Sequence, residues 1–155
     1  MDAHHIALVP ARAALGATML YHGSDKLRGQ GPEQTAQFFR QIGLEPAPLL
    51  AKLTGWTELL AGAATVLGFA TRASALAVLV TQGMAVAKVH RLKGFNNLAG
   101  GYEFNLLIMA VAAGLLLAGP GEVSAHGAVA RRGERRWRPF APRRSLSERL
   151  LLALG

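Results

Sequence analysis

The chain has 155 residues, a length typical of one domain, and 51% of them are hydrophobic while only 17% are charged. It contains no cysteine, which excludes disulfides, thiolate zinc sites and iron–sulfur clusters held by this chain. Its mean hydropathy of +0.26 is high for a water-soluble domain of this size and indicates a membrane protein.

The net charge of +8 is concentrated near the C-terminus, because eight of the 17 Lys and Arg residues lie within 131–149. No motif that reads nucleic acid accompanies this basic stretch, so nucleic acid is a disfavoured partner. A basic stretch that follows an apolar region fits the cytoplasmic side of a membrane, or contact with anionic lipid, better.

Four apolar stretches are predicted to cross the membrane as helices, since each is close to the ~20 residues that span ~30 Å of hydrocarbon. They cover residues 6–22, 50–69, 73–89 and 104–118. Together they predict an all-α fold, an integral membrane antiparallel four-helix transmembrane bundle. We divide the chain into this bundle (1–122) and a basic, mostly flexible cytoplasmic tail (123–155).

The long connection after the first stretch carries a helix signal of its own. Pro32 and Glu33 begin an amphipathic run that Gly43 can end. We expect a short interfacial helix here, lying at the membrane surface. Its apolar residues, which are expected to face inward, are Phe38, Phe39 and Ile42.

The later connections are shorter. Residues 70–72 make the second and third helices a tight antiparallel hairpin. The sequence Gly119-Pro120-Gly121 is expected to end the fourth helix. The Arg-rich tail contains Pro139 and Pro142 and is predicted to be extended or disordered, apart from an interfacial helix candidate at 145–154.

Four crossings place both termini on one side of the membrane. That side carries ten Lys and Arg residues and the other side seven, so the positive-inside rule predicts cytoplasmic termini. Small residues spaced four apart are expected to let helices approach closely, either within the chain or in a homo-oligomer. These pairs are Ala13 with Ala17, Ala64 with Gly68, and Gly114 with Ala118.

Charged residues within the apolar stretches are costly, so they are usually paired or line a cavity. Arg12 lies in the first stretch and Glu58 in the second, at depths that differ by roughly 10 Å, and an extended Arg side chain bridges most of that distance. We predict that the two pair. The pair either locks the bundle or forms a polar site for a substrate head or a quinone carbonyl. Alternatively, Arg12 extends to the inner surface.

A second group of polar residues is predicted at the extracytoplasmic ends of the helices. It comprises His22, Asp25, Lys26, Lys88, His90 and Glu103, with Glu58 somewhat below them. Histidine titrates near neutral pH, and burial can raise the pKa of a Glu side chain toward neutral pH. Such a group could therefore take up the protons of quinol oxidation. The alternative is a belt of interfacial salt bridges without a ligand.

The same residues include side chains that can ligate a haem or a metal ion. His22 and His90 could ligate a haem at one depth, but their positions at helix ends disfavour this. Metal binding by His22, His90, Glu58 and Glu103 is disfavoured because no helix carries a His/Glu pair three or four residues apart. No metal site is assigned.

A series of residues in a fixed order extends from residue 6 to about 126. Its members are Arg12, Leu15-Gly16, His22-Gly23, Lys26-Leu27, Phe38-Phe39, Ile42-Gly43, Glu58, Gly62, Leu67-Gly68, Arg72, His90, Gly100-Gly101-Tyr102-Glu103 and Gly119-Pro120-Gly121. This series resembles the DoxX family of small bacterial four-helix membrane proteins. The family commonly has Ser-Leu-Asp after the last helix, where this chain has Ser124-Ala125-His126.

The resemblance implies a multi-pass protein of the bacterial inner (plasma) membrane, tied to quinol oxidation and thiosulfate:quinone oxidoreduction. We therefore expect a membrane subunit of a redox complex that handles a quinone, with soluble redox partners, and that is not clearly catalytic alone. The candidate catalytic residues are Glu58, Arg12, His22 and Glu103, and the candidate substrate-binding residues are Lys26 and His90.

Two other functions compete with this one. The first is a non-catalytic scaffold whose charges are structural and whose basic tail recruits soluble partners or anionic lipid. The second is a small-molecule carrier, which the lack of inverted repeats or a broken helix disfavours.

Overall fold

The computed structural model describes the backbone of residues 3–136 and 146–154, and the side chains of 6–130 and 150–154. These residues form helices and loops without strands. The α-helices are α1 (Ala3–Leu27), α2 (Gly31–Gln41), α3 (Ala47–Leu67), α4 (Thr71–Ala85), α5 (Glu103–Ala118), α6 (Ala125–Arg136) and α7 (Leu146–Leu154). The chain after α4 continues through a π-helical turn, Val86–His90, and two short 3₁₀ turns, Arg91–Lys93 and Asn97–Ala99. Each predicted apolar stretch thus coincides with a helix.

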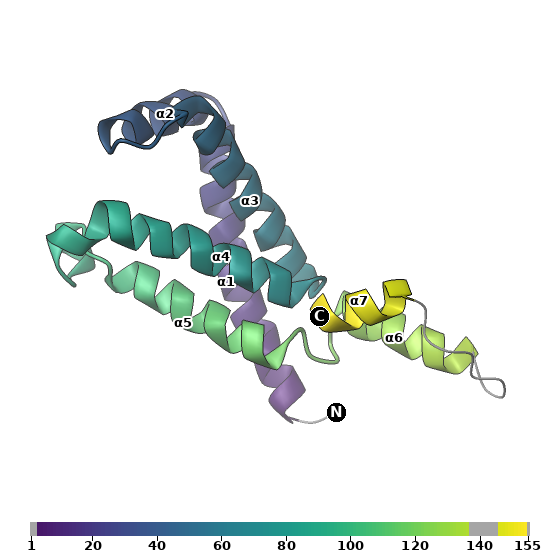
Figure 1. The fold of residues 1–155 in the computed structure, drawn as a ribbon. Coiled ribbons are helices and arrows are strands. Elements are labelled where there is room, and N and C mark those ends of the chain that lie inside the picture. The colour runs from purple at the N-terminus through teal and green to yellow at the C-terminus, as the bar shows by residue number, and fades with distance from the viewer. Residues whose placement is uncertain (1–2, 137–145, 155) are drawn as a thin grey trace.

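The helices end where the sequence provides a suitable residue. Gly68 follows α3 with a φ of 67°, a left-handed conformation that glycine adopts without strain. The Gly68 N–H donates to the Thr65 carbonyl (3.1 Å) and the Phe69 N–H to the Ala64 carbonyl (2.9 Å), so the last turn is satisfied. The chain enters α4 after three residues, a connection as short as predicted, but α3 and α4 then spread apart and do not form the tight hairpin expected of them (Figure 1).

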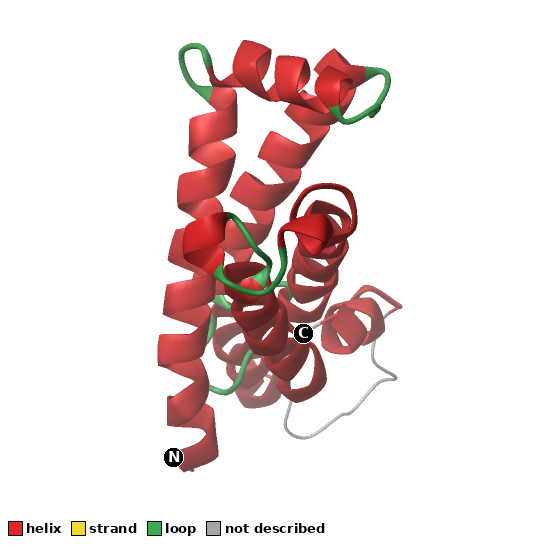
Figure 2. Cartoon of the chain, turned by 90° about the vertical axis from the view of Figure 1, so that its left-hand side faces the viewer, coloured by secondary structure: helices red, strands yellow, loops and turns green. Residues whose placement is uncertain are grey.

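The helices form two antiparallel hairpins, α1 with α3 and α4 with α5 (Figure 1). Helix α2 lies across one end of the first hairpin, and the second hairpin crosses the first obliquely instead of running beside it (Figures 1 and 2). The two hairpins come together where α3 turns into α4 and spread apart toward α2 (Figure 1). The expected bundle with four helices along one axis is therefore not the arrangement that these residues adopt.

Four glycines bring α1 and α3 into backbone contact, and we call this contact the glycine interface. It consists of Gly16 and Gly23 on α1 and Gly55 and Gly62 on α3. A Cβ atom on Gly62 would lie 2.6 Å from the Leu20 nitrogen and 2.8 Å from the Gly16 carbonyl oxygen, closer than any real side chain approaches. The small-residue pairs expected to serve this purpose were different ones, and one of their members, Gly68, is used to end α3.

Apolar side chains join the second hairpin to the first. Met19 of α1, Val78 of α4 and Leu115 of α5 are almost fully buried in this core. A smaller cluster holds α2 against α3, where Phe39 packs on the Ala36, Ala47 and Ala51 cluster. Phe38, which was expected to face inward with Phe39, is 38% exposed.

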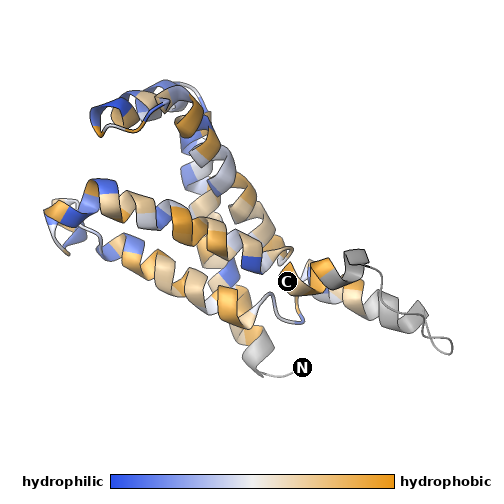
Figure 3. Cartoon of the chain, viewed as in Figure 1, coloured by the Kyte–Doolittle hydropathy of each residue, from blue (hydrophilic) through white to orange (hydrophobic). Residues whose placement is uncertain are grey.

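In the long helices, several polar side chains are buried and many apolar side chains are exposed. Buried polar and charged side chains include Arg12, Glu58, Gln82 and Asn105, whereas many large apolar side chains are exposed. The exposed apolar residues include Leu53, Trp56, Leu60, Leu76, Val80, Met84, Leu106, Leu107 and Leu117. Figure 3 shows hydrophobic colours along α4 and α5 and hydrophilic ones near α2. Such a surface is unfavourable in water and suited to lipid.

One helical stretch in the described part of the chain, Thr71–Lys93, is long and apolar enough to cross a membrane by length and composition. Glu103–Ala118 is apolar but shorter. Helices α1 and α3 have the length, but their charged and small residues lower their hydropathy. The four predicted crossings are thus four helices, of which one meets both criteria.

The tail is more helical than its prolines suggested. Residues 125–136, expected to be extended, form α6, whose first turn is capped because the Gly127 N–H donates to Ser124 Oγ (2.9 Å). Residues 146–154 form the helix expected there. Pro139 and Pro142 lie outside the described residues.

Candidate functional site

A salt bridge connects α1 to α3 near the α2 end of the first hairpin. Lys26 Nζ lies 2.7 Å from Glu58 Oε2, and it also donates to the His22 carbonyl at 3.4 Å. The Glu58 side chain is only 5% exposed and that of Lys26 is 24% exposed. The lysine therefore compensates a buried carboxylate while its own ammonium stays close to the surface of the protein.

The glycine interface makes this salt bridge possible. Gly55 lies one helical turn before Glu58, and a Cβ there would meet the Leu27 side chain at 2.8 Å and Lys26 Cβ at 3.2 Å. Because Gly55 has no side chain, the stem of Lys26 passes across α3 and its ammonium reaches Glu58.

A pair of amides lies on the other hairpin. Asn105 Nδ2 of α5 donates to Gln82 Oε1 of α4 at 2.8 Å, and both residues are buried. Thr81 points into the same region, and its hydroxyl donates to the Val78 carbonyl at 3.1 Å. Buried amides that pair in this way hold their helices in one register.

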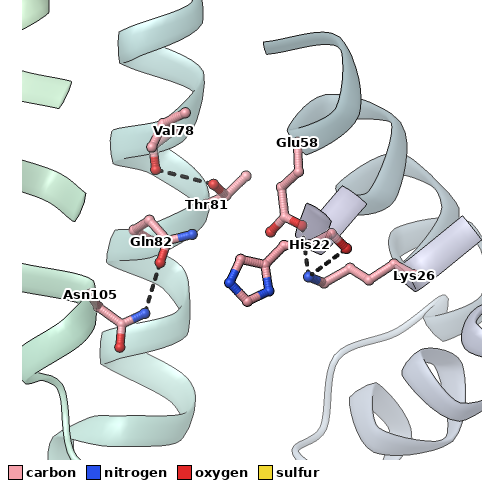
Figure 4. A network of polar contacts seen from close by, with 7 residues as sticks. All are labelled: His22, Lys26, Glu58, Val78, Thr81, Gln82 and Asn105. Carbon is pink, nitrogen blue, oxygen red and sulfur yellow. Dashed lines mark hydrogen bonds and ion pairs between the residues drawn. The ribbon is translucent and has the colours of Figure 1, made fainter. Parts of the chain in front are cut away.

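His22 lies between the salt bridge and the amide pair (Figure 4). Its ring is half-buried and lies 6.3 Å from the Phe104 ring, which belongs to α5. Its charged neighbours are Lys26, Glu58 and Asp25. The two hairpins thus contribute polar side chains to one place, which we call the polar cluster: His22, Lys26, Glu58, Gln82 and Asn105.

The polar cluster has unused hydrogen-bonding capacity. Within the described residues, Glu58 Oε1, the Gln82 amide nitrogen, the Asn105 side-chain oxygen and the His22 ring nitrogens make no hydrogen bond. Among the described residues, the fully buried side-chain atoms without a hydrogen-bond partner are Arg12 Nε, Thr65 Oγ1 and Thr71 Oγ1, and none of them belongs to the polar cluster. The free atoms of the polar cluster are therefore not fully enclosed, and each keeps some exposed surface.

The predicted pair of Arg12 and Glu58 is wrong. Glu58 binds Lys26, whereas Arg12 Nη1 donates to the Pro120 carbonyl and its guanidinium lies against Gly68. Gly68 is ten residues beyond Glu58, about 15 Å along α3 at 1.5 Å per residue. Arg12 therefore joins the ends of α3 and α5 at the opposite end of the hairpins, where its guanidinium donates to the Pro120 carbonyl.

His90 and Glu103 do not join the polar cluster either. His90 Nδ1 donates to the Gly100 carbonyl at 2.7 Å, and Glu103 Oε2 accepts from the Asn97 N–H at 3.1 Å. Both side chains therefore fix the loop between α4 and α5. The predicted extracytoplasmic group separates into two parts: His22 and Lys26 meet Glu58, while His90 and Glu103 hold a loop.

The positions of the histidine and acidic side chains bear on whether this chain could bind haem or a metal ion. His90 Nδ1 bonds to the Gly100 carbonyl in the loop between α4 and α5, and a haem ligated by His22 and His90 stays a disfavoured expectation. No group of three or more His, Asp or Glu side chains within the described residues is placed to hold a metal ion. The donors and acceptors of the polar cluster instead suit an uncharged ligand with oxygen atoms.

The sequence analysis assigned no role to Gln82 or to Asn105. The available signal was their position inside apolar helices, where an amide needs a partner on a neighbouring helix. Such a residue on the third helix predicts another on the second or fourth, and Asn105 is the amide within α5. The need of Gln82 for a hydrogen-bond partner could be inferred from the sequence, but identifying Asn105 as that partner required the geometry of the hairpin.

The DoxX family model matches residues 7–91, more than half of the chain, and includes most of α1, all of α2 to α4 and four of the five members of the polar cluster. No curated protein and no solved structure matches the chain. The chain therefore belongs to the DoxX family, a family of membrane proteins often linked to redox or quinone-related functions.

Proposed function

We propose that this chain is an integral membrane subunit of a redox complex and that it binds a quinone in the polar cluster. The observation that supports this most is the set of unsealed, unpaired donors and acceptors around His22, contributed by both hairpins. Quinones have the matching chemistry, because an apolar ring and tail reach the site through lipid and carbonyl oxygens accept hydrogen bonds.

The three members of the polar cluster on the first hairpin each have a role in this proposal. Lys26 donates to a ligand carbonyl with an N–H that its salt bridge leaves free, and Glu58 Oε1 accepts from a hydroxyl of the reduced form. His22 accepts or returns a proton at a ring nitrogen. A bound quinone would take up two electrons and two protons on reduction to the quinol, and the quinol would release them on oxidation. With no cysteine in this chain, we assign the electron transfer to partner subunits.

We further propose that α1, α3, α4 and α5 all cross the membrane, with both termini in the cytoplasm. Helices of 25 and 21 residues, α1 and α3, are about 37 and 31 Å long, enough for ~30 Å of hydrocarbon. Helix α5, with 16 residues, is about 24 Å long and needs local thinning of the bilayer or help from its flanking residues. Burial of Arg12 and Glu58 within the protein supports this placement, because neither charge faces lipid.

Thermal unfolding of the purified full chain in detergent, with and without decylubiquinone, tests the quinone site. We expect the quinone to raise the midpoint for the wild-type protein. Glu58→Gln and His22→Ala should reduce that rise, whereas the matched control Glu33→Gln, at an exposed position on α2, should not. Absence of any quinone-dependent rise in the wild-type protein would contradict the proposal.

Membrane topology can be tested directly because the chain has no cysteine. Single cysteines at the exposed residues Gln30, Phe69 and Leu98 report on three successive loops. We expect an impermeant maleimide to label the variants at Gln30 and Leu98 in spheroplasts with an intact inner membrane, and the variant at Phe69 only after lysis. Labelling of Gln30 and Leu98 on opposite sides contradicts four crossings.

The scaffold alternative depends on a different part of the chain. The eight Lys and Arg residues in 131–149 lie outside the family match, which suggests a separate role for the tail. Deletion of residues 131–155 tests it: loss of co-purifying partners with unchanged membrane insertion supports docking through the tail. Unchanged recovery of partners contradicts it.

A further inference from the structure

We propose that Gln82, oriented by Asn105, is a second ligand contact and makes the site selective for molecules that carry oxygen atoms at two opposite ends. This inference rests on the proposed quinone site and extends it to the second hairpin. It assigns Gln82 as a specificity-determining residue and Asn105 as a positioning residue.

The hydrogen bond within the amide pair determines which group Gln82 offers. Asn105 Nδ2 donates to Gln82 Oε1, so the oxygen of Gln82 is used and its NH₂ group remains as a donor. Figure 4 shows this NH₂ group on the side of Gln82 that faces His22, away from Asn105. Since Gln82 is only 6% exposed, its rotation is restricted and the donor is held in place.

The two hairpins therefore present separate contacts on either side of His22. Lys26 and Glu58 belong to α1 and α3, whereas Gln82 and Asn105 belong to α4 and α5. A ligand that satisfies both sets must have hydrogen-bonding atoms at both ends of one rigid body. The carbonyl oxygens of a para-quinone point in opposite directions across the ring, while a ring with one carbonyl can engage only one hairpin.

The same arrangement explains how the site can discriminate. A buried donor without an acceptor is unfavourable, so a ligand that leaves the Gln82 NH₂ group unpaired binds less well than one that satisfies it. A site built to hydrogen-bond a substrate group rejects the analogue that lacks the group more strongly than an apolar pocket could.

The test compares menadione, which has two ring carbonyls, with 1-tetralone, a similar bicyclic ring with one. Binding of both to the purified full chain in detergent is measured for the wild type, Gln82→Leu and the control Gln37→Leu, an exposed amide on α2. We expect Gln82→Leu to lower the preference for menadione over tetralone roughly 3- to 10-fold by weakening menadione alone. Gln37→Leu should leave the preference unchanged.

Asn105→Leu separates positioning from contact. It should lower the same preference by a smaller factor, because Gln82 remains but is no longer held. The double variant Gln82→Leu with Asn105→Leu removes both partners, leaves no amide unpaired and provides a folded protein if the single change is too destabilising. It should show the same lowered preference as Gln82→Leu.

The outcomes distinguish this inference from the proposed function. If the wild type binds menadione and neither Gln82→Leu nor the double variant alters the preference, the role of Gln82 is overturned while the quinone site stands. Equal weakening of both ligands assigns Gln82 a purely structural role and overturns the inference as well. If the wild type binds neither compound, the proposed function itself fails.

Discussion

The two hairpins are held together in different ways. In α1 and α3, glycines allow backbone to touch backbone, and a salt bridge crosses the contact. In α4 and α5, apolar side chains and one pair of amides make the contact, and the two glycines of these helices, Gly83 and Gly114, have no atom within 4 Å of a Cβ placed on them. The first hairpin is therefore a closely fitted unit, and the second is joined by side chains.

This difference indicates how a membrane protein can hold a charged pair. A buried ion pair is favourable only when its geometry is well fixed, and the glycine interface fixes it by setting the distance between α1 and α3. Amides carry no net charge and tolerate a looser contact. The hairpin with the tight backbone contact accordingly carries Lys26 and Glu58, and the other carries Gln82 and Asn105.

The largest effect is expected from breaking the salt bridge. Lys26→Met leaves the buried Glu58 carboxylate without its cation and should lower the free energy of unfolding by about 3 kcal/mol, near the low end for a buried pair because Lys26 is partly exposed. Equilibrium unfolding in mixed detergent micelles measures it. The double variant with Glu58→Gln should recover part of the loss. Equal stability of Lys26→Met and the wild type would show that the pair contributes nothing.

A smaller effect is expected from adding one methyl group to the glycine interface. Gly62→Ala places a Cβ 2.6 Å from the Leu20 nitrogen and should lower the free energy of unfolding by about 2 kcal/mol. Gly114→Ala on α5 meets nothing and should raise stability by up to about 1 kcal/mol through helix propensity. Similar values for both variants would remove the contrast between the hairpins.

The amide pair should contribute less to stability than either. Gln82→Leu leaves the Asn105 amide buried without a partner and should cost about 1 kcal/mol of the free energy of unfolding. The double variant Gln82→Leu with Asn105→Leu should be close to the wild type, since no amide remains unpaired. A double variant less stable than the single one runs against this account of the pair.

The smallest effect concerns Arg12 and ligand binding. Because its guanidinium lies about 15 Å from Glu58 along α3, Arg12→Lys should change the quinone affinity less than about twofold. Titration of the folded variant with decylubiquinone measures this, with Glu58→Gln as the comparison. A loss of quinone affinity as large as that of Glu58→Gln would show that Arg12 contributes to the quinone site.

The positions of the helices followed from the sequence because apolar length and turn residues are local signals. Gly119 and Pro120 ended α5 as expected, and Pro32 marked the start of α2. The family could also be recognised from the sequence, and the DoxX family model matches residues 7–91.

The contacts between helices could not be predicted in the same way. Estimates of depth along each helix placed Arg12 within reach of Glu58, but which face of α1 meets α3 depends on the register that the glycines impose. In that register Lys26, not Arg12, reaches Glu58. The amide pair was missed for a related reason, because pairing Gln82 with Asn105 requires knowing which faces of α4 and α5 meet.

Photoaffinity labelling of the full chain with an azidoquinone tests the central claim most directly, namely that one ligand contacts both hairpins. After tryptic digestion, we expect label in peptide 53–72, which contains Glu58, and in peptide 73–88, which contains Gln82, and excess decylubiquinone should prevent both. Peptide 29–40 from α2 should remain unlabelled. Label confined to one hairpin, or label that decylubiquinone does not displace, would contradict a shared site.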